Sequence, residues 1–215
     1  MFCASKLLLF IALLTTAGFS KAQRQIISPA KYKILYTGVY NVLEIMLEGC
    51  PCDELVVIPE NGAITPRGCG LYNYRADTPG KTSFYLTCTK GSNRDTVRSG
   101  YYQVQYPPLP VADINNSVGS HIDSKRLCDG KRIGLRNKDF YYDAYYRVLR
   151  YDITLLYGKD ARSITLANEG EAFTNEISAL LCTAVPGDIV MVRNIQVVGP
   201  GDVQSEIAPI IFDVK

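Results

Sequence analysis

The sequence is poor in the side chains on which most catalytic and metal chemistry depends. Tryptophan is absent, and the one histidine, His121, lies in the polar stretch 115–125, where we expect a solvated loop. A single imidazole leaves little material for acid/base catalysis or for a histidine-rich zinc site. H-E-x-x-H, G-x-S-x-G and glycine-rich phosphate-binding patterns are also missing. We therefore expect no enzymatic activity, cofactor or bound metal; a pair of carboxylates for glycoside hydrolysis is the alternative that residue content leaves open.

An excess of charge of either sign is lacking as well. Lysine and arginine together number 23, against 21 aspartates and glutamates. Proteins that bind nucleic acids usually carry a basic surplus, because neutralisation of phosphates dominates their affinity. Hydrophobic residues make up 47% of the chain, which is enough for a folded core. We therefore expect a globular chain that does not bind nucleic acid.

Long apolar runs are missing, and the single short run lies at the N-terminus. Residues 1–22 combine the basic Lys6, an apolar stretch over 7–14 and a small-x-small site at 20–22. This pattern is typical of a secretory signal peptide that is cleaved before Gln23. The run is well short of the roughly 20 residues that span a bilayer. We expect no membrane span after cleavage, and an exported chain that is periplasmic or secreted.

Six cysteines follow this segment: Cys50, Cys52, Cys69, Cys88, Cys128 and Cys182. An even number of cysteines in an oxidising compartment predicts disulfides. Cys50 and Cys52 share one face of an extended chain and are too constrained to prefer each other, so we expect each to reach Cys69 or Cys88. Cys128 and Cys182 are then expected to pair. A metal site at Cys50-Pro51-Cys52 is the alternative, but its spacing differs from that of C-x₂-C zinc knuckles.

Proline is concentrated near the middle of the chain. The run Tyr106-Pro107-Pro108-Leu109-Pro110 holds three of the 11 prolines. Each proline fixes φ and removes a backbone donor, so the run is extended and stiff. We predict a first domain over residues 23–106, a linker over 107–110 and a second domain over 111–215. Each domain is about the size of a small β-sandwich.

Strand patterns fill the first half. Leu43, Ile45 and Leu47 are separated by single residues, which predicts a strand with one buried face. Asn61-Gly62 and Pro79-Gly80 predict turns, because these residues favour turn backbone angles. A period of 3.6 is not found there, so we expect no helix in this half.

The second half adds a helix to further strands. Thr174 is a suitable N-cap, and apolar residues then recur at helical spacing from Ile177 to Ala184. Strands are expected over Ile189–Val198, which is rich in β-branched residues, and over Ile210–Val214. The predicted fold class is all-β, with two tandem immunoglobulin-like β-sandwich domains, the second of which carries one short helix.

Aromatic residues crowd the stretch 140–148. Their alternation predicts an extended strand, and a one-residue slip of the apolar phase predicts a β-bulge near Leu149-Arg150. Tyr141, Tyr145 and Arg147 share the face opposite the apolar one. This row is a candidate partner-binding surface, although a second layer of the same domain covering it is the alternative.

Several of these runs together resemble one known family. In the first half, Ile34–Ile45 reads as a strand, Gly38-Val39, Asn41 and a second strand. In the second half the matching pieces are Phe140–Val148, Phe173-Thr174 and the ordered series Pro186-Gly187-Asp188, Asn194-Ile195 and Gly199-Pro200. These runs resemble the C-terminal periplasmic region of the gliding motility protein GldM, a component of the type IX secretion machinery. The resemblance extends over about residues 33–215.

The resemblance implies a non-enzymatic protein that docks on outer-membrane-associated ring components of the secretion machinery, or on its cargo. Full GldM proteins carry an N-terminal transmembrane helix, whereas here a signal peptide runs almost directly into the first matching strand. We therefore expect the distal docking role without transmission of torque. The six cysteines fall outside the family pattern and suggest a stapled, free-standing version, as a single chain or a homo-oligomer. The alternative function is a secreted carbohydrate- or surface-binding module of adhesin type.

Overall fold

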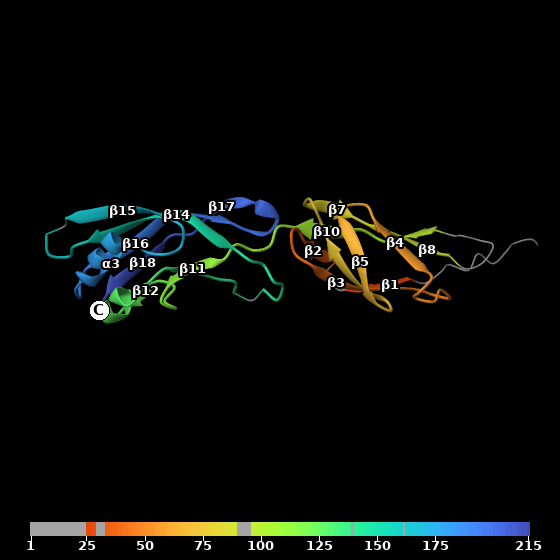
Figure 1. The fold of residues 1–215 in the computed structure, drawn as a ribbon, viewed down its shortest axis with the longest axis horizontal. Coiled ribbons are helices and arrows are strands. Elements are labelled where there is room, and N and C mark those ends of the chain that lie inside the picture. The colour runs from red at the N-terminus through yellow and green to blue at the C-terminus, as the bar shows by residue number, and fades with distance from the viewer. Residues whose placement is uncertain (1–24, 29–32, 90–95, 139, 161) are drawn as a thin grey trace, which may run out of the picture.

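The computed structural model describes residues 25–28, 33–89, 96–138, 140–160 and 162–215. The predicted signal peptide lies outside these ranges. Strands predominate in both halves, so the all-β prediction is confirmed. Its immunoglobulin-like detail stays a prediction. The two halves follow one another along the long axis of the molecule, and the C-terminus lies at the end away from the first half (Figure 1).

The described part of the first half contains ten strands and no helix, as the missing helical period predicted. They are β1 (Gln25–Ser28), β2 (Ile34–Tyr36), β3 (Asn41–Leu47), β4 (Leu55–Pro59), β5 (Ala63–Gly68), β6 (Leu71–Arg75), β7 (Gly80–Thr82), β8 (Phe84–Cys88), β9 (Thr96–Arg98) and β10 (Tyr102–Gln105). Their sheets have the orders β1-β3-β6-β5, β2-β10-β7 and β4-β8-β9. Strand β3 buries every second side chain, as predicted. The rings of Tyr74, Phe84 and Tyr102 meet edge-on in the core between the sheets.

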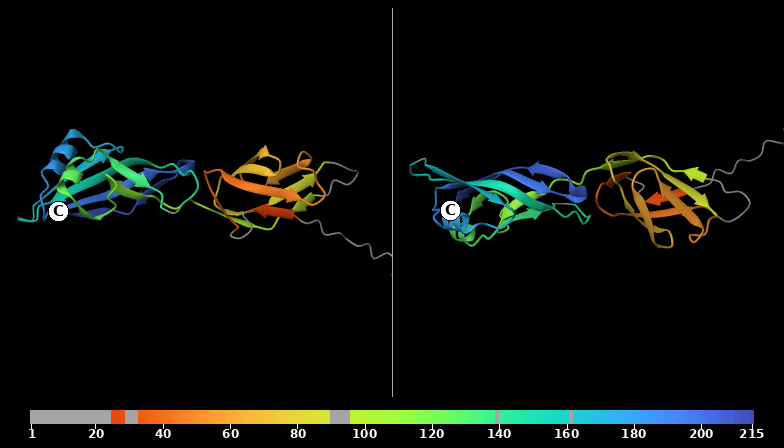
Figure 2. Two further views of the ribbon diagram at one scale, coloured as in Figure 1. Left: turned by 90° about the horizontal axis from the view of Figure 1, so that it is seen from below. Right: turned by 45° about the horizontal axis from the view of Figure 1, so that its top comes forward.

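The second half is built on one large sheet. Its elements are β11 (Val111–Ile114), β12 (Ser120–Ile122), α2 (Ser124–Cys128), β13 (Ile133–Arg136), β14 (Arg147–Leu156), β15 (Ser163–Glu169), α3 (Asn175–Cys182), β16 (Ile189–Val198), the 3₁₀ turn η1 (Pro200–Asp202), β17 (Gln204–Ile207) and β18 (Ile210–Val214). The sheet has the order β12-β18-β16-β14-β15, with β17 paired to β16, while β11 and β13 form a separate pair. The core includes side chains of the large sheet, of β11 and β13, and of both helices. Figure 2 shows these elements from two further directions.

Three local predictions for the second half are confirmed. Strands β16 and β18 have the predicted bounds. Helix α3 begins after Thr174, whose hydroxyl accepts a hydrogen bond of 3.2 Å from the Ile177 amide. The pairing of β14 with β16 shifts register between Val148 and Asp152, which is the predicted bulge. Local patterns therefore placed these elements correctly.

Three other predictions need correction. Helix α2 was not expected; the Asp123 carboxylate caps it by accepting from two amides. His121 lies in β12 rather than in a loop, although it is exposed, and its Nδ1 is 3.6 Å from the Asp213 carboxylate. The strand expected from residue 140 begins only at Arg147, because the Ala144 amide bonds the Tyr142 carbonyl (2.8 Å) in a tight turn. Burial still alternates through 140–147 as the pattern indicated.

All six described cysteines are in disulfides. Cys50 is joined to Cys88 and Cys52 to Cys69, which is one of the two arrangements that the sequence left open. Cys128 is joined to Cys182, as expected. The first two bridges join segments within the first half, whereas the third links the last residues of α2 and α3. Because these cysteines are oxidised, a metal site at Cys50-Pro51-Cys52 has no free thiolate ligands.

The two halves touch through short, conformationally restricted turns. Gly38 has φ +70° and lies against η1: an added Cβ would be 2.6 Å from the Gly201 nitrogen. Only glycine fits there, because this φ and this contact both exclude a side chain. On the same side of the first half, the ring of Tyr36 packs against Phe140 and Tyr142. The halves are therefore in direct contact as well as linked by residues 107–110.

Candidate protein-binding surface

The row predicted as a partner-binding surface is exposed. Tyr141 is 98% exposed and Tyr145 is 81% exposed, and Arg147 is exposed as well. The alternative, in which a second layer of the domain covers them, is therefore excluded for the two tyrosines. Tyr145 lines a groove of the second half, and the tight turn at residues 142–144 separates it from Tyr141. The binding role of the three residues stays a prediction.

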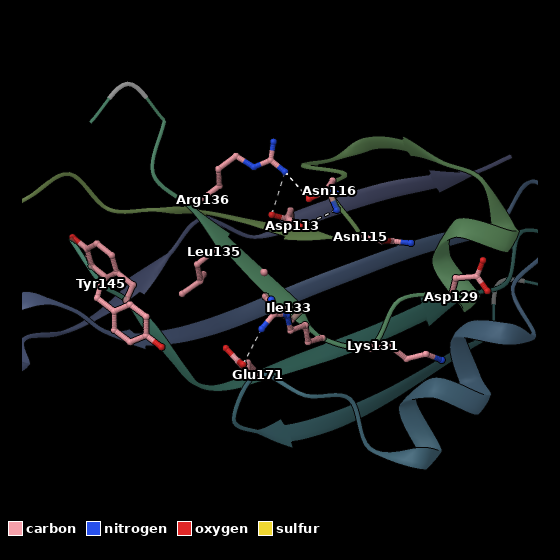
Figure 3. A pocket seen from close by; sticks show the side chains of 13 residues that line it. Asp113, Asn115, Asn116, Asp129, Lys131, Ile133, Leu135, Arg136, Tyr145 and Glu171 are labelled. Atoms are coloured by element: carbon pink, nitrogen blue, oxygen red, sulfur yellow. Dashed lines mark hydrogen bonds and ion pairs between the residues drawn. The ribbon is translucent and has the colours of Figure 1, made fainter. Parts of the chain in front are cut away.

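Tyr145 lies at one end of a groove of about 720 Å³ on the second half. Strand β13 runs along this groove, with Ile133 and Leu135 in its middle (Figure 3). Lys131 and Asp129 lie toward the other end. The remaining lining is mostly polar and comes from β11 and the turn after it, from β13 and the residue before it, from the residue before β14 and from the segment after β15: Asp113, Asn115, Asn116, Arg132, Gly134, Arg136, Tyr146 and Glu171.

Strand β13 presents an open edge to this groove. One edge pairs with β11 over four residues. On the other edge the Ile133 amide donates to the Glu171 carbonyl (2.9 Å), so the backbone groups of Ile133 point away from β11. Groups two residues apart in a strand point the same way, so those of Leu135 also point away from β11. In the described residues, the bonding to the segment 171–173 does not continue to Leu135. This position can therefore accept hydrogen bonds from, and donate them to, an incoming extended chain.

An ordered ion pair forms one wall of the groove. The Arg136 guanidinium lies 3.5 Å from the Asp113 carboxylate and donates to the Asn116 side chain (3.3 Å). Asp113 is nearly buried and also accepts from the Asn116 amide (2.9 Å). A Cβ at Gly134 would be 2.8 Å from an Asp113 oxygen, so glycine makes room for this carboxylate. The pair holds the arginine in one position at the rim.

Further charged groups surround the other end. Arg132 pairs with Glu171 at 3.2 Å, beside the isolated backbone bridge between Arg132 and Ala172. Lys125 donates to Asp129 (2.7 Å), and this hydrogen bond lowers the pKa of the Asp129 carboxyl, with a smaller contribution from Lys131. Such exposed pairs contribute little to stability, but they fix the pattern of charge along the groove.

Tyr146 separates this groove from the proline-rich linker. Its hydroxyl donates to the Pro108 carbonyl (3.0 Å), and its ring packs so closely on Gly199 that an added Cβ would be 2.3 Å from the ring. Burial raises the pKa of the Tyr146 hydroxyl. Because these contacts hold Tyr146 in place, they also fix the backbone from which the neighbouring Tyr145 enters the groove.

Sequence reasoning found Tyr145 but missed the rest of the groove. The alternation Ile133-Gly134-Leu135-Arg136 and the Asn115-Asn116 pair, which has positive φ at both residues, were the available signals for a strand and a turn. Their pairing could not be derived locally. Among the described residues no cluster of three His, Cys, Asp or Glu side chains is placed to hold a metal. In the same ranges, the helices are too short to cross a bilayer.

Comparison with known proteins identifies the second half. The family of the GldM C-terminal domain matches residues 108–215, which is half of the chain. No curated protein matches the chain. Among solved structures, Yersinia pseudotuberculosis InvD shares 10% sequence identity, over 89% of this chain and 68% of that one, with a TM-score of 0.25. So low a TM-score does not define a common fold.

The family match confirms the resemblance that the residue runs of the second half indicated. For the first half, the similarity of Ile34–Ile45 to the same proteins stays a prediction, because the match begins at residue 108. The order of Pro186-Gly187-Asp188, Asn194-Ile195 and Gly199-Pro200 lies entirely within the matched part. By residues 108–215, this chain belongs to the family of the GldM C-terminal domain.

Proposed function

We propose that this chain is an exported, non-enzymatic module that binds another protein through the groove beside β13. The family of its second half is associated with gliding and type IX secretion, so the expected partner is a component of that machinery or its cargo. The observation that carries the proposal is the open edge of β13 at Leu135, beside the exposed ring of Tyr145.

The edge favours an extended partner segment. Strand addition gives affinity through backbone hydrogen bonds, and the neighbouring side chains select the sequence. The Leu135 backbone supplies the first of these contributions. Tyr145 supplies a large ring with few rotatable bonds, of the kind that is enriched at the energetic centres of interfaces.

The charges of the groove select among such segments. Arg132 and Arg136 are already paired with Glu171 and Asp113, so they are held in place and present hydrogen-bond donors at the rim. Lys131 extends the basic side of the groove near the end of α2. We therefore expect the partner segment to be extended and to carry an acidic or amide side chain next to Tyr145.

The proposal also includes the compartment and the domain arrangement of the chain. Disulfides persist in oxidising compartments, which agrees with a signal peptide over residues 1–22 and a location in the periplasm. We propose domains over residues 23–106 and 111–215. Their contact at Gly38 and η1 limits their relative movement, so that both can dock on an assembled ring at a fixed separation.

The test is a cross-linking pulldown from the periplasm of the source cell with tagged protein. The Tyr145→Ala variant removes the ring in the groove, whereas the Tyr141→Ala variant removes an equally large, more exposed ring outside it. We expect wild type and Tyr141→Ala to enrich a secretion or gliding component, and Tyr145→Ala to lose at least tenfold of that enrichment. Recovery of polysaccharide alone would contradict the proposal and support the carbohydrate-binding alternative. Equal recovery of the component by all three proteins would show that the groove does not bind it.

A further inference from the structure

Strand β15 forms an open edge of the large sheet. In the described part of the chain, it is bonded to β14 alone, in an unbroken antiparallel register of seven residue pairs. It lies at the border of the second half (Figure 1). None of its residues lines the groove beside β13.

The backbone groups that β15 leaves free can be assigned from its ends. The Tyr157 amide donates to the Arg162 carbonyl (2.9 Å), and the Gly170 amide donates to the Leu149 carbonyl (2.6 Å). Because hydrogen-bonded pairs alternate in an antiparallel ladder, the even-numbered residues from 162 to 170 bond to β14. The odd-numbered residues Ser163, Thr165 and Ala167 therefore direct their amides and carbonyls away from the sheet.

Most of this edge lacks the features that usually protect an edge strand. Residues 163–168 contain no proline and no charged side chain, and their pairing with β14 has no bulge. Ile164 is 42% exposed although its cross-strand neighbour Leu155 is fully buried. Leu166 is half-buried against the core. A further strand along this edge would cover both apolar side chains.

We propose that β15 pairs in antiparallel fashion with β15 of a second copy of this chain, around a two-fold axis at Thr165. In this register Ser163 lies opposite Ala167 of the second copy, and all the free backbone groups from 163 to 167 find partners. Ile164 lies opposite Leu166, so the two incompletely buried side chains meet each other. Arg162 meets Asn168, so that like charges do not face one another.

The sequence of the strand favours this occupant and register. A shift of two residues in one direction would place Leu166 opposite Arg162, and a shift in the other direction would place Ile164 opposite Asn168. Only the axis at Thr165 matches apolar with apolar at both positions, as a self-complementary two-fold interface requires. One strand pair buries less than the roughly 1,200 Å² of a stable interface, so the association is weak and depends on concentration.

Sedimentation velocity of the mature, disulfide-bonded protein over a concentration series tests the proposal. We expect wild type to shift from one copy to two as its concentration rises into the high micromolar range. Ile164→Lys places a charged side chain opposite Leu166 of the second copy at both symmetry-related positions and should abolish the shift. Ile211→Lys is the matched control, because Ile211 is a 51% exposed isoleucine on β18, within the same sheet. A single copy for wild type at every concentration, or equal association of the Ile164→Lys variant, would overturn the proposal.

A second variant covers the case in which Ile164→Lys does not fold. In Thr165→Cys, the two thiols would lie across the axis, within reach of a short thiol-reactive cross-linker. We expect a covalent pair of chains from Thr165→Cys but not from Ile211→Cys. Absence of that pair, or the same yield from both variants, rejects the β15 interface. Neither result affects the groove beside β13, since its residues are unchanged.

Discussion

The ring of Tyr36 stands edge-on to the ring of Phe140, with centroids 4.9 Å apart and planes at 89°. Tyr142 completes the cluster at 5.2 Å from each of the other two rings. Edge-to-face pairs of this kind contribute about 0.5–1.5 kcal/mol beyond their buried area. This aromatic contact joins the first half to the segment that leads into Tyr145, so it connects the relative placement of the halves to the groove.

The close contact of Gly38 with η1 can be tested by comparison with Gly49, a glycine that has a similar φ but no neighbour. Gly38→Ala and Gly49→Ala both place a side chain at positive φ, +70° and +76°, but only the first meets a neighbour. We expect Gly38→Ala to cost about 1–3 kcal/mol more in unfolding free energy, because the Pro200–Gly201 backbone must move. Urea unfolding measures this difference, and small-angle scattering should show a changed arrangement of the halves for Gly38→Ala alone. Equal effects of the two substitutions would contradict the close contact.

Asn41 holds the turn that presents Gly38. Its side-chain oxygen accepts from the Tyr36 amide (2.8 Å), and its amide donates to the carbonyls of Tyr36, Val39 and Tyr74. Asn41→Ala should cost about 3 kcal/mol or more, because several buried groups lose their partners.

Asn73, on the outer face of β6, is the control, since the structure gives its side chain no hydrogen bond among the described residues. Asn73→Ala should change the unfolding free energy by less than about 0.5 kcal/mol. Thermal and urea unfolding of both variants measure the contrast. A loss below about 1 kcal/mol for Asn41→Ala would show that the turn does not depend on this side chain.

The disulfide of the second half should stabilise it more than the smaller bridge stabilises the first half. Cys128 and Cys182 are 54 residues apart in sequence, against 17 for Cys52 and Cys69. The chain-entropy relation gives about 4 kcal/mol for the Cys128–Cys182 bridge and about 3 kcal/mol for the Cys52–Cys69 bridge. Replacing each pair by serine and comparing urea midpoints with the wild type tests the order. The reverse order would show that factors in the folded state outweigh loop length.

Tyr151 predicts a loss of stability at alkaline pH. Its hydroxyl is buried, makes no hydrogen bond within the described residues, and burial raises its pKa. The unfolded chain then ionises first, so the stabilising contribution is complete below the ordinary tyrosine pKa of about 10 and is lost as the pH rises above it.

The Tyr151→Phe variant isolates this effect. It should unfold at the same or a higher urea concentration at pH 8, because it removes a buried hydroxyl without a partner. Between pH 8 and pH 11 it should lose less stability than wild type. An identical alkaline loss in Tyr151→Phe and wild type would assign the effect to other tyrosines.

Elements with a strong local signal could be predicted from sequence. The β-branched run of β16, the alternation of β3 and the cap and apolar spacing of α3 are each encoded within a few neighbouring residues. The bulge in β14 was also visible, because a slip of the apolar phase occurs within one strand. Tyr145 was found for the same reason, as one member of an alternating row.

The rest depended on contacts between distant segments. Helix α2 has only five residues and one buried side chain, Leu127, so it lacks a helical period to detect. The groove requires β13 to pair with β11 on one edge and to meet Glu171 on the other, and no local pattern specifies either neighbour. The parallel pairing that draws His121 into β12 is equally invisible in the sequence.

Site-specific photo-cross-linking tests the central claim, that the groove beside β13 binds a partner protein, most directly. A photoreactive amino acid replaces Tyr145 in one protein and Tyr141 in another, and both are irradiated in the periplasm of the source cell. We predict a discrete cross-linked product at position 145 that contains a component of the secretion or gliding machinery, and none at position 141. A partner captured equally at both positions, or at position 141 alone, would contradict the claim.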